Sequence, residues 1–254
     1  MEITLETAAF LFAVATGAGF IDAIAGGGGL LTLPALLAAG VPAAAALGTN
    51  KLQASGGSFA ASLYFVRQGA VDLQALRFCI AMTFTGAAAG ALTVQLMNVD
   101  DLKTLLPFLV FAIGLYFLFS PNIGQGSGKA RLSLAAFALT AALGIGFYDG
   151  VFGPATGSFL TLAFISLLGF ALPQAVAHAK VLNFTSNFAS LLFFILGGAV
   201  LWKIGLLMLC GQLIGGYFGA RTVVGSGKKL IRPLLVLMSF AMVGKMVYEQ
   251  GWLG

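Results

Sequence analysis

Four charged residues stand inside long apolar stretches of the chain, where a charge is unfavourable unless it has a partner or a function. They form two related sets, Asp22 with Lys51 and Asp149 with Lys180. The ammonium groups of Lys51 and Lys180 could attract an anion. The two carboxylates cannot bind an anion while ionised. They could instead hold the lysines, accept backbone N–H groups or carry a proton, and the sequence leaves open whether Asp22 supports Lys51 or carries a proton.

Each lysine begins a polar stripe at helical spacing. The stripes are Lys51, Ser55, Ser58 and Ser62, and Lys180, Asn183, Asn187 and Ser190. Residues at such intervals share one face of a helix, which we expect to point inward. Together with Asn50, these ammonium, amide and hydroxyl donors suit a small anion. In the alternative, each lysine pairs with the nearby aspartate only to neutralise charge, or extends its side chain to the membrane surface.

Two glycine-rich breaks follow the two aspartates. The first is the run Gly26–Gly29, in which Gly27 and Gly28 would let a ligand approach the backbone. In the second, Pro154 breaks the helix, and Thr156 or Ser158 could cap the next helix and contact a ligand. Helix N-termini carry free N–H groups and partial positive charge, so both breaks favour an anion. In the alternative, the small residues only permit close helix crossing.

The remaining titratable residues give little sign of other chemistry. His178, two residues before Lys180, could relay a proton near neutral pH or pair with a charge, although a lone histidine is more often a hydrogen-bonded structural residue. Cys79 and Cys210 are isolated and show no metal-ligand spacing. We therefore expect no metal and no cofactor.

Composition fixes the class of protein that must position these residues. Of 254 residues, 59% are hydrophobic and 8% are charged, with a mean hydropathy of +1.01. Soluble domains carry about 25% charged residues, so we predict an all-α polytopic membrane protein without a soluble domain. The start, MEITLE, lacks the basic residues of a cleaved signal peptide. The net charge of +5 does not indicate nucleic acid, because the basic residues lie mostly in short loops.

The chain contains an internal repeat. The segment GAGFIDAIAGGG beginning at Gly17 resembles GIGFYDGVFGPATG beginning at Gly144, and after a two-residue insertion the register holds at an offset of 129 residues. Lys51 then aligns with Lys180. We expect one integral membrane domain made of two repeats, residues 1–125 and 126–254.

Apolar runs predict about five helical segments in each repeat. They cover residues 7–25, 28–40, 43–66, 73–97 and 103–120, and then 132–152, 156–169, 173–196, 202–223 and 231–248. Segments 28–40 and 156–169 directly follow the glycine-rich breaks and are short for a full span, so they could be half-helices or re-entrant segments.

Loop charges predict an inverted repeat. Arg67 and Arg77, then Lys129 and Arg131, and then the cluster from Arg221 to Arg232 mark three basic loops, which the positive-inside rule places in the cytoplasm. The loop equivalent to 67–77 is the apolar loop 197–202, and the acidic loop 98–103 corresponds to the basic one at 221–232. Equivalent loops would thus face opposite sides, a pattern typical of secondary transporters.

The paired motifs resemble those of the TauE/SafE family of sulfite exporters and sulfonate permeases, and most resemble its bacterial inner-membrane members. The resemblance rests on GFIDAIAGGGGLLTLPALLAAGVPAAAALGTNKLQ, GFYDGVFGPATGSFLTLAF and AHAKVLNFTSNFASLLFF, and it covers nearly the whole chain. It implies transport of small anions, often sulfur-containing, such as sulfite, sulfonates or sulfoacetate. It places the family's glycine-rich motifs on Gly19–Gly29 and Gly146–Gly157. Thr49-Asn50 precedes Lys51, whereas His178-Ala179 precedes Lys180, so the site should not be fully symmetric.

The leading prediction is a secondary transporter, not an enzyme, that moves a small anion by alternating access. Lys51 and Lys180 would attract the substrate, with Asn50, Asn183 and Asn187 as donors. No Walker motif is present, so energy would come from a proton or Na⁺ gradient or from the substrate's own gradient. The alternatives are an anion channel, a membrane enzyme using Asp22, Asp149 and His178, which lacks any supporting motif, and a structural membrane partner.

Overall fold

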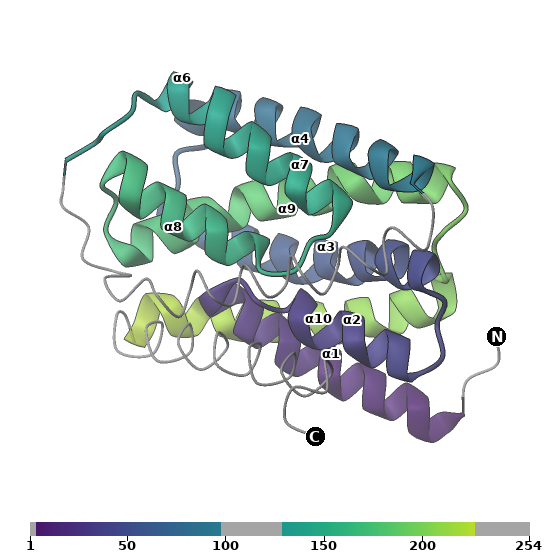
Figure 1. Ribbon diagram of the computed structural model, residues 1–254. Helices are drawn as coiled ribbons and strands as arrows, with labels where there is room; N and C mark the ends of the chain where they lie inside the picture. The colour runs from purple at the N-terminus through teal and green to yellow at the C-terminus, as the bar shows by residue number, and fades with distance from the viewer. Residues whose placement is uncertain (1–3, 98–128, 227–254) are drawn as a thin grey trace, which may run out of the picture.

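The computed structural model describes residues 4–97 and 129–226, and all regular elements there are helical (Figure 1). The first half contains α1 (Leu5–Ala25), α2 (Gly29–Ala38), α3 (Ala43–Arg67) and α4 (Leu73–Leu96). The second contains α6 (Leu134–Phe137), the π-helical turn η1 (Ala138–Ala142), α7 (Leu143–Val151), α8 (Thr156–Leu168), α9 (Leu172–Leu196) and α10 (Trp202–Ser226). The predicted helices in these ranges are confirmed to within a few residues at each end.

Some predictions fall on residues that the structure leaves out. The expected helices 103–120 and 231–248, the acidic loop 98–103 and the basic residues after 226 lie outside the described ranges. The division into repeats at residues 125 and 126 also falls there, and it stays a prediction.

Five helical stretches within the described ranges are long and apolar enough to cross a bilayer: α1, α4, α6 to α7 taken together, α9 and α10. In contrast, α2 has 10 residues and α8 has 13. At 1.5 Å per residue they are about 15 and 20 Å long, against about 30 Å of hydrocarbon. The chain is therefore a multi-pass helical membrane protein, in which α2 and α8 are too short to cross.

Burial in this molecule differs from that in a soluble protein at its exposed leucines and its buried charges. Leu96 and Leu196 are 88% and 81% exposed, whereas Lys51 and Lys180 are 1% and 0% exposed. Both polar stripes that begin at these lysines are buried, as predicted. An apolar exterior with charges inside suits a lipid environment, because hydrocarbon can solvate the exposed leucines and cannot solvate the lysines.

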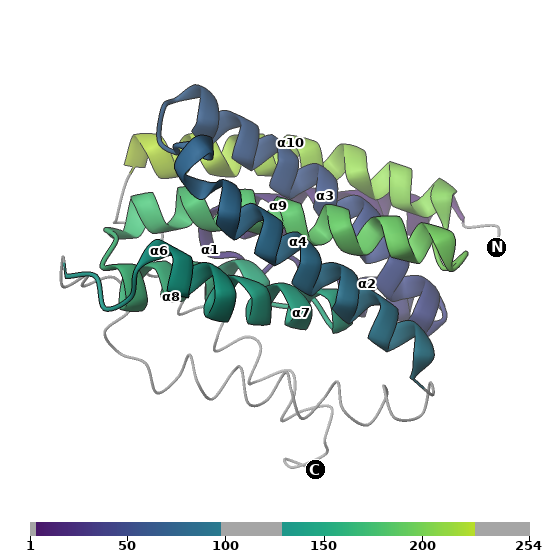
Figure 2. The same cartoon turned by 90° about the horizontal axis from the view of Figure 1, so that it is seen from above.

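The helices pack in a reciprocal pattern (Figures 1 and 2). Central helices α3 and α9 contact each other, α1 lies along α10, and α4 lies along α7. Glycines bring the outer pairs into backbone contact: a Cβ on Gly86 or Gly90 would collide with α7, and one on Gly215 or Gly219 would collide with α1. The Gly-xxx-Gly spacings therefore serve helix packing.

Helices that the predicted repeat would pair run in opposite directions. In Figure 1, α1 and α3 run from right to left, whereas α7 and α9 run from left to right. The loop after α3 lies at that helix's C-terminal end. The loop before α10 lies at the N-terminal end of α3, where the Leu201 N–H donates to Thr49 Oγ1 at 3.0 Å. The loop after α3 and the loop before α10 thus lie at opposite ends of α3.

Candidate functional site

The two glycine-rich breaks meet near the middle of the molecule. After α1, Gly26 adopts a φ of +80°, and before α8, Gly153 and Ala155 adopt +94° and +62°. A Cβ on Gly26 would collide with the backbone of Gly157, and one on Gly157 would collide with Gly26. Ser158 Oγ donates to the Ala25 carbonyl at the end of α1, which ties the two breaks together. Only glycine at both positions permits this crossing.

Two ion pairs flank the crossing, and each joins one half of the chain to the other. Lys180 Nζ lies 2.8 Å from Asp22 Oδ2, and Lys51 Nζ lies 3.0 Å from Asp149 Oδ1. Asp22 therefore supports Lys180 rather than Lys51, its neighbour in sequence. Both lysines are neutralised by a carboxylate, so neither presents a free positive charge to an anion in this conformation.

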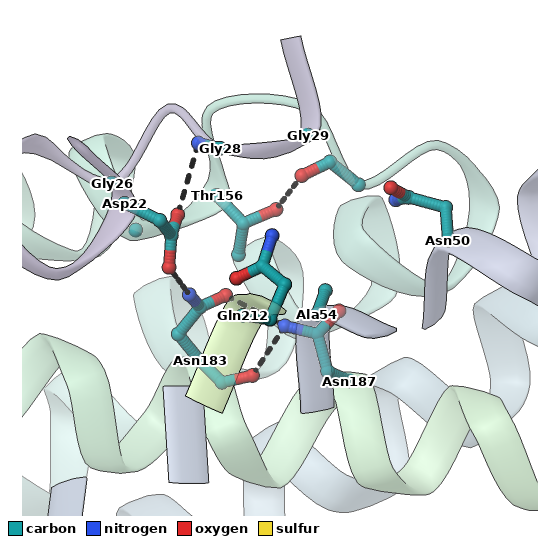
Figure 3. A pocket seen from close by; sticks show the side chains of 12 residues that line it. Asp22, Gly26, Gly28, Gly29, Asn50, Ala54, Thr156, Asn183, Asn187 and Gln212 are labelled. Carbon is teal, nitrogen blue, oxygen red and sulfur yellow. Dashed lines mark hydrogen bonds between the residues drawn. The ribbon is translucent and has the colours of Figure 1, made fainter. Parts of the chain in front are cut away.

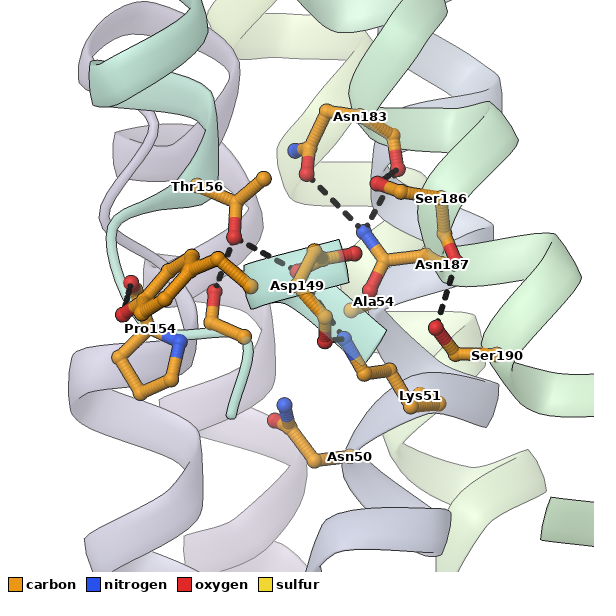
Figure 4. A network of polar contacts seen from close by, with 12 residues as sticks. Asn50, Lys51, Ala54, Asp149, Pro154, Thr156, Asn183, Ser186, Asn187 and Ser190 are labelled. Carbon is orange, nitrogen blue, oxygen red and sulfur yellow. Dashed lines mark hydrogen bonds and ion pairs between the residues drawn. The ribbon is translucent and has the colours of Figure 1, made fainter. Parts of the chain in front are cut away.

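Each carboxylate also binds the start of a half-helix. Asp22 Oδ1 accepts the Gly28 N–H at 3.1 Å, and its Oδ2 accepts Asn183 Nδ2 at 3.4 Å (Figure 3). Asp149 Oδ1 accepts the Thr156 hydroxyl at 2.6 Å, and Lys51 Nζ also donates to the Asp149 carbonyl (Figure 4). The ion pairs thus fix the N-terminal ends of α2 and α8.

A small cavity lies between the two breaks (Figure 3). The centre of a water molecule can occupy about 20 Å³ of it, slightly more than the roughly 10–15 Å³ that one water needs. Its lining is Asp22, Gly26, Gly28, Gly29, Asn50, Ala54, Gly153, Thr156, Gly157, Asn183, Asn187 and Gln212. In this conformation the space is on the scale of a single water molecule, so a larger head group would fit only if the elements around it moved apart.

Two residues that line this cavity, one at each helix start, have unpaired backbone donors. The N–H groups of Gly29 and Gly157 have no acceptor within residues 4–97 and 129–226. These glycines belong to the first turns of α2 and α8, where unpaired N–H groups and the helix dipole give partial positive charge.

The three predicted amides line the cavity, and two are held in a chain. Asn187 Nδ2 donates to the backbone carbonyl and Oδ1 of Asn183 at 2.8 and 3.1 Å. Asn50 Oδ1 accepts Thr32 Oγ1 at 2.6 Å and Gln53 Nε2 at 2.7 Å. The Asn50 NH₂ group has no acceptor in the part of the chain that the structure describes, so it is available to a ligand.

Gly27, Thr156 and Ser158 do not take the roles predicted for them. Gly27 does not line it, and Ser158 binds α1 instead. The residue before α8 is Ala155, which makes no side-chain capping bond, so the prediction that Thr156 or Ser158 caps this helix is wrong. Thr156 does line the cavity, but its hydroxyl binds Asp149 and the Gly153 carbonyl.

His178 belongs to an aromatic cluster away from the cavity. Its Nδ1 lies 2.8 Å from the Gln174 carbonyl, and its ring packs against Phe164 and Phe170. Among the described residues it forms no ion pair. No cluster of three or more His, Cys, Asp or Glu side chains that could hold a metal ion occurs within the described ranges.

Gln212 is a site residue that sequence reasoning did not identify. It comes from α10, lines the cavity and is 2% exposed. Its type was the available signal, because an amide inside an apolar span is costly in lipid. Gly211 and Gly215 on either side give this stretch the spacing of a helix-packing segment, which makes the amide less conspicuous.

Comparisons with known proteins agree with this membrane architecture. The family described as "Sulfite exporter TauE/SafE" matches residues 11–246. The chain is 55% identical over 252 residues to a "Probable membrane transporter protein" of Haemophilus influenzae, covering 99% of each chain. It is 53% identical over 250 residues to "Probable membrane transporter protein YfcA" of Escherichia coli K12, covering 96% of this chain and 93% of the relative.

A third relative, "Probable membrane transporter protein ORF9" of a Sinorhizobium species, is 46% identical over 258 residues, covering 100% of this chain and 99% of the relative. No solved structure matches. With a family match over most of its length and relatives covered almost end to end, the chain belongs to the TauE/SafE sulfite exporter family of membrane transporters.

Proposed function

We propose that this protein is a secondary transporter that carries a small, sulfur-containing anion, such as sulfite, a sulfonate or sulfoacetate, across the bacterial inner membrane by alternating access. The family name supports a sulfur oxyanion as the substrate class. Energy comes from a proton or Na⁺ gradient or from the substrate gradient, because the sequence has no nucleotide-binding motif.

One observation carries the proposal. The N-termini of two half-helices, α2 and α8, open onto one cavity between the two halves, and each offers an unpaired N–H group there, from Gly29 and Gly157. Helix N-termini at the membrane midplane are a recurrent way to bind anionic groups in transporters.

The lysines act in this proposal through their aspartates. Each ion pair joins opposite halves, Lys180 to Asp22 and Lys51 to Asp149. The opposite directions of equivalent helices support an inverted repeat. If one half rocked against the other, the distances within both ion pairs would change. The half-helices α2 and α8, which these pairs hold, would then shift.

Transport by purified protein in liposomes tests the proposal. Uptake of labelled sulfite or a simple sulfonate should saturate, and unlabelled substrate inside the vesicles should accelerate it by counterflow. Asn50→Ala should reduce uptake by at least about tenfold, because it removes a donor to the anion. Thr85→Ala is the matched control, since this exposed hydroxyl bonds only to its own helix.

Two results would contradict the proposal. If no sulfur anion moves through the wild-type protein, the substrate class is wrong. If the protein instead passes ohmic single-channel currents without counterflow, it is a channel rather than a carrier.

A further inference from the structure

Gln212 presents an amide to the cavity with no partner of its own. The residue is 2% exposed, yet its side chain makes no hydrogen bond to any residue in the described ranges. Figure 3 shows this amide among Asp22, Asn183 and Asn50. Buried amides are nearly always hydrogen-bonded, so one that faces an internal cavity without a partner calls for an explanation.

The neighbouring helices are shaped to admit this side chain. A Cβ on Gly19 of α1 would collide with Gln212, and so would a Cβ on Gly57 of α3. Glycine on both flanking helices therefore leaves the path along which Gln212 extends from α10. The repeat counterpart of Gln212 is Thr83, which is also buried but does not line the cavity. This feature thus belongs to one half only.

The donors that face the cavity are uncharged. They are the NH₂ groups of Gln212 and Asn50 and the backbone N–H groups of Gly29 and Gly157. Asp22 also lines the cavity, but it is neutralised by Lys180 and both of its oxygens accept hydrogen bonds. The two helix N-termini supply about +0.5 elementary charge each, so together they compensate about one negative charge.

We infer that the cavity binds the oxyanion head group of a monoanion through uncharged donors, and that Gln212 sets this preference. The inference rests on the proposed function and specifies the charge state of its substrate. A dianion would keep one uncompensated charge in a buried site, which is strongly unfavourable. A neutral molecule of the same shape would gain nothing from the two helix dipoles. Sulfite would accordingly bind as hydrogensulfite, and a simple sulfonate would be favoured over sulfoacetate, which is a dianion at neutral pH.

Equilibrium binding to the detergent-purified protein tests this inference without requiring transport. Three compact probes separate charge from shape: methanesulfonate is a monoanion, sulfate is a dianion, and dimethyl sulfone is neutral. Titration calorimetry and the ligand-dependent rise in melting temperature both report binding. We expect methanesulfonate to bind at least about tenfold more tightly than either of the other probes. Equal affinity for sulfate, or no binding of methanesulfonate, would overturn the inference.

Substitution of Gln212 separates a ligand-binding role from a structural one. Gln212→Leu should weaken methanesulfonate binding by about 10- to 100-fold, because a donor to a charged group is lost. Without ligand it should melt at the same temperature as the wild type or higher, because it removes an unpaired buried amide. If Gln212 were only structural, the variant would melt at a lower temperature and still bind methanesulfonate as the wild type does. Gln212→Ala provides a second variant should the leucine fit poorly.

Thr83→Val is the matched control, since it alters the repeat counterpart, whose buried hydroxyl has no partner among the described residues and lies outside the cavity. Its binding should equal that of the wild type. If Gln212→Leu binds methanesulfonate as well as the wild type does, the role of Gln212 is refuted while transport can still hold. If the wild type binds methanesulfonate but moves no sulfur anion, the binding site stands and the transporter proposal fails.

Discussion

At the scale of single residues, the buried charges show how a membrane protein retains groups that lipid cannot solvate. Lys51 and Asp149 are each 1% exposed, and Asp149 Oδ2 has no hydrogen-bond partner within the described ranges. Buried ion pairs of this kind contribute little net stability, but the loss of one partner leaves an uncompensated charge. The retention of such a costly pair supports a role in function.

Removal of one or both charges distinguishes stability from function. Lys51→Met should destabilise the fold by about 3–5 kcal/mol, because Asp149 is left unpaired. The double variant Lys51→Met with Asp149→Leu should recover most of that loss, since no buried charge remains. Thermal unfolding in detergent measures both effects, and liposome uptake of the double variant should stay low. Normal uptake by the double variant would show that the pair is structural only.

At the scale of the elements, the broken helices define the site. The stretch after α1 turns back at Gly26, and its backbone lies directly against Gly157 at the start of α8. An unbroken helix at either place would satisfy its own N–H groups and leave none for a ligand. The breaks therefore place free donors in the interior of a membrane protein, where irregular backbone occurs only beside a cavity or other protein.

A pair of glycine substitutions tests how much of this depends on the crossing. Gly26 and Gly40 have nearly the same φ, +80° and +79°, but a Cβ at Gly40 meets nothing within 4 Å. Gly40→Ala should lower the free energy of unfolding by about 1–2 kcal/mol, because it adds only the strain of a left-handed backbone conformation. Gly26→Ala should cost clearly more and abolish uptake, because its Cβ collides with the backbone of α8. Similar melting temperatures for the two variants would mean that the breaks do not touch.

At the scale of the whole molecule, the reciprocal packing gives the two ends different charges. The loop from α3 to α4, the start of α6 and the end of α10 lie at the same end of the molecule (Figure 1). Basic residues flank these segments: Arg67, Arg77, Arg131 and Arg221. The positive-inside rule predicts that this end faces the cytoplasm.

Labelling of single cysteines tests this orientation. In a background with Cys79→Ala and Cys210→Ala, Gln68→Cys should react with a membrane-impermeant maleimide only after the membrane is permeabilised. Lys203 lies at the start of α10, near the opposite end of α3. Lys203→Cys should therefore react in intact spheroplasts. Both native residues are exposed, so access to the reagent depends on the side of the membrane. Equal labelling of the two positions in intact spheroplasts would rule out the predicted orientation.

The sequence by itself determined the class of protein and most of its elements. Apolar length predicted the helices, because a segment must satisfy its own backbone in lipid wherever it lies in the fold. The stripes at Lys51 and Lys180 predicted their buried faces, since helical periodicity is a local property. The offset of 129 residues predicted which positions of the two halves correspond, and the two glycine-rich breaks were read from the same comparison.

Only the tertiary structure decided which groups meet. Lys51 and Asp149 are 98 residues apart, and Lys180 and Asp22 are 158 apart, so nothing in local spacing selected these partners over the nearer ones. Where the two breaks cross, each lysine pairs with the aspartate of the other half and is neutralised. Uncharged N–H and amide groups then line the cavity. Gln212 joined them because glycines on two other helices leave room for it. Such contacts depend on packing between distant segments, which periodicity along one segment does not record.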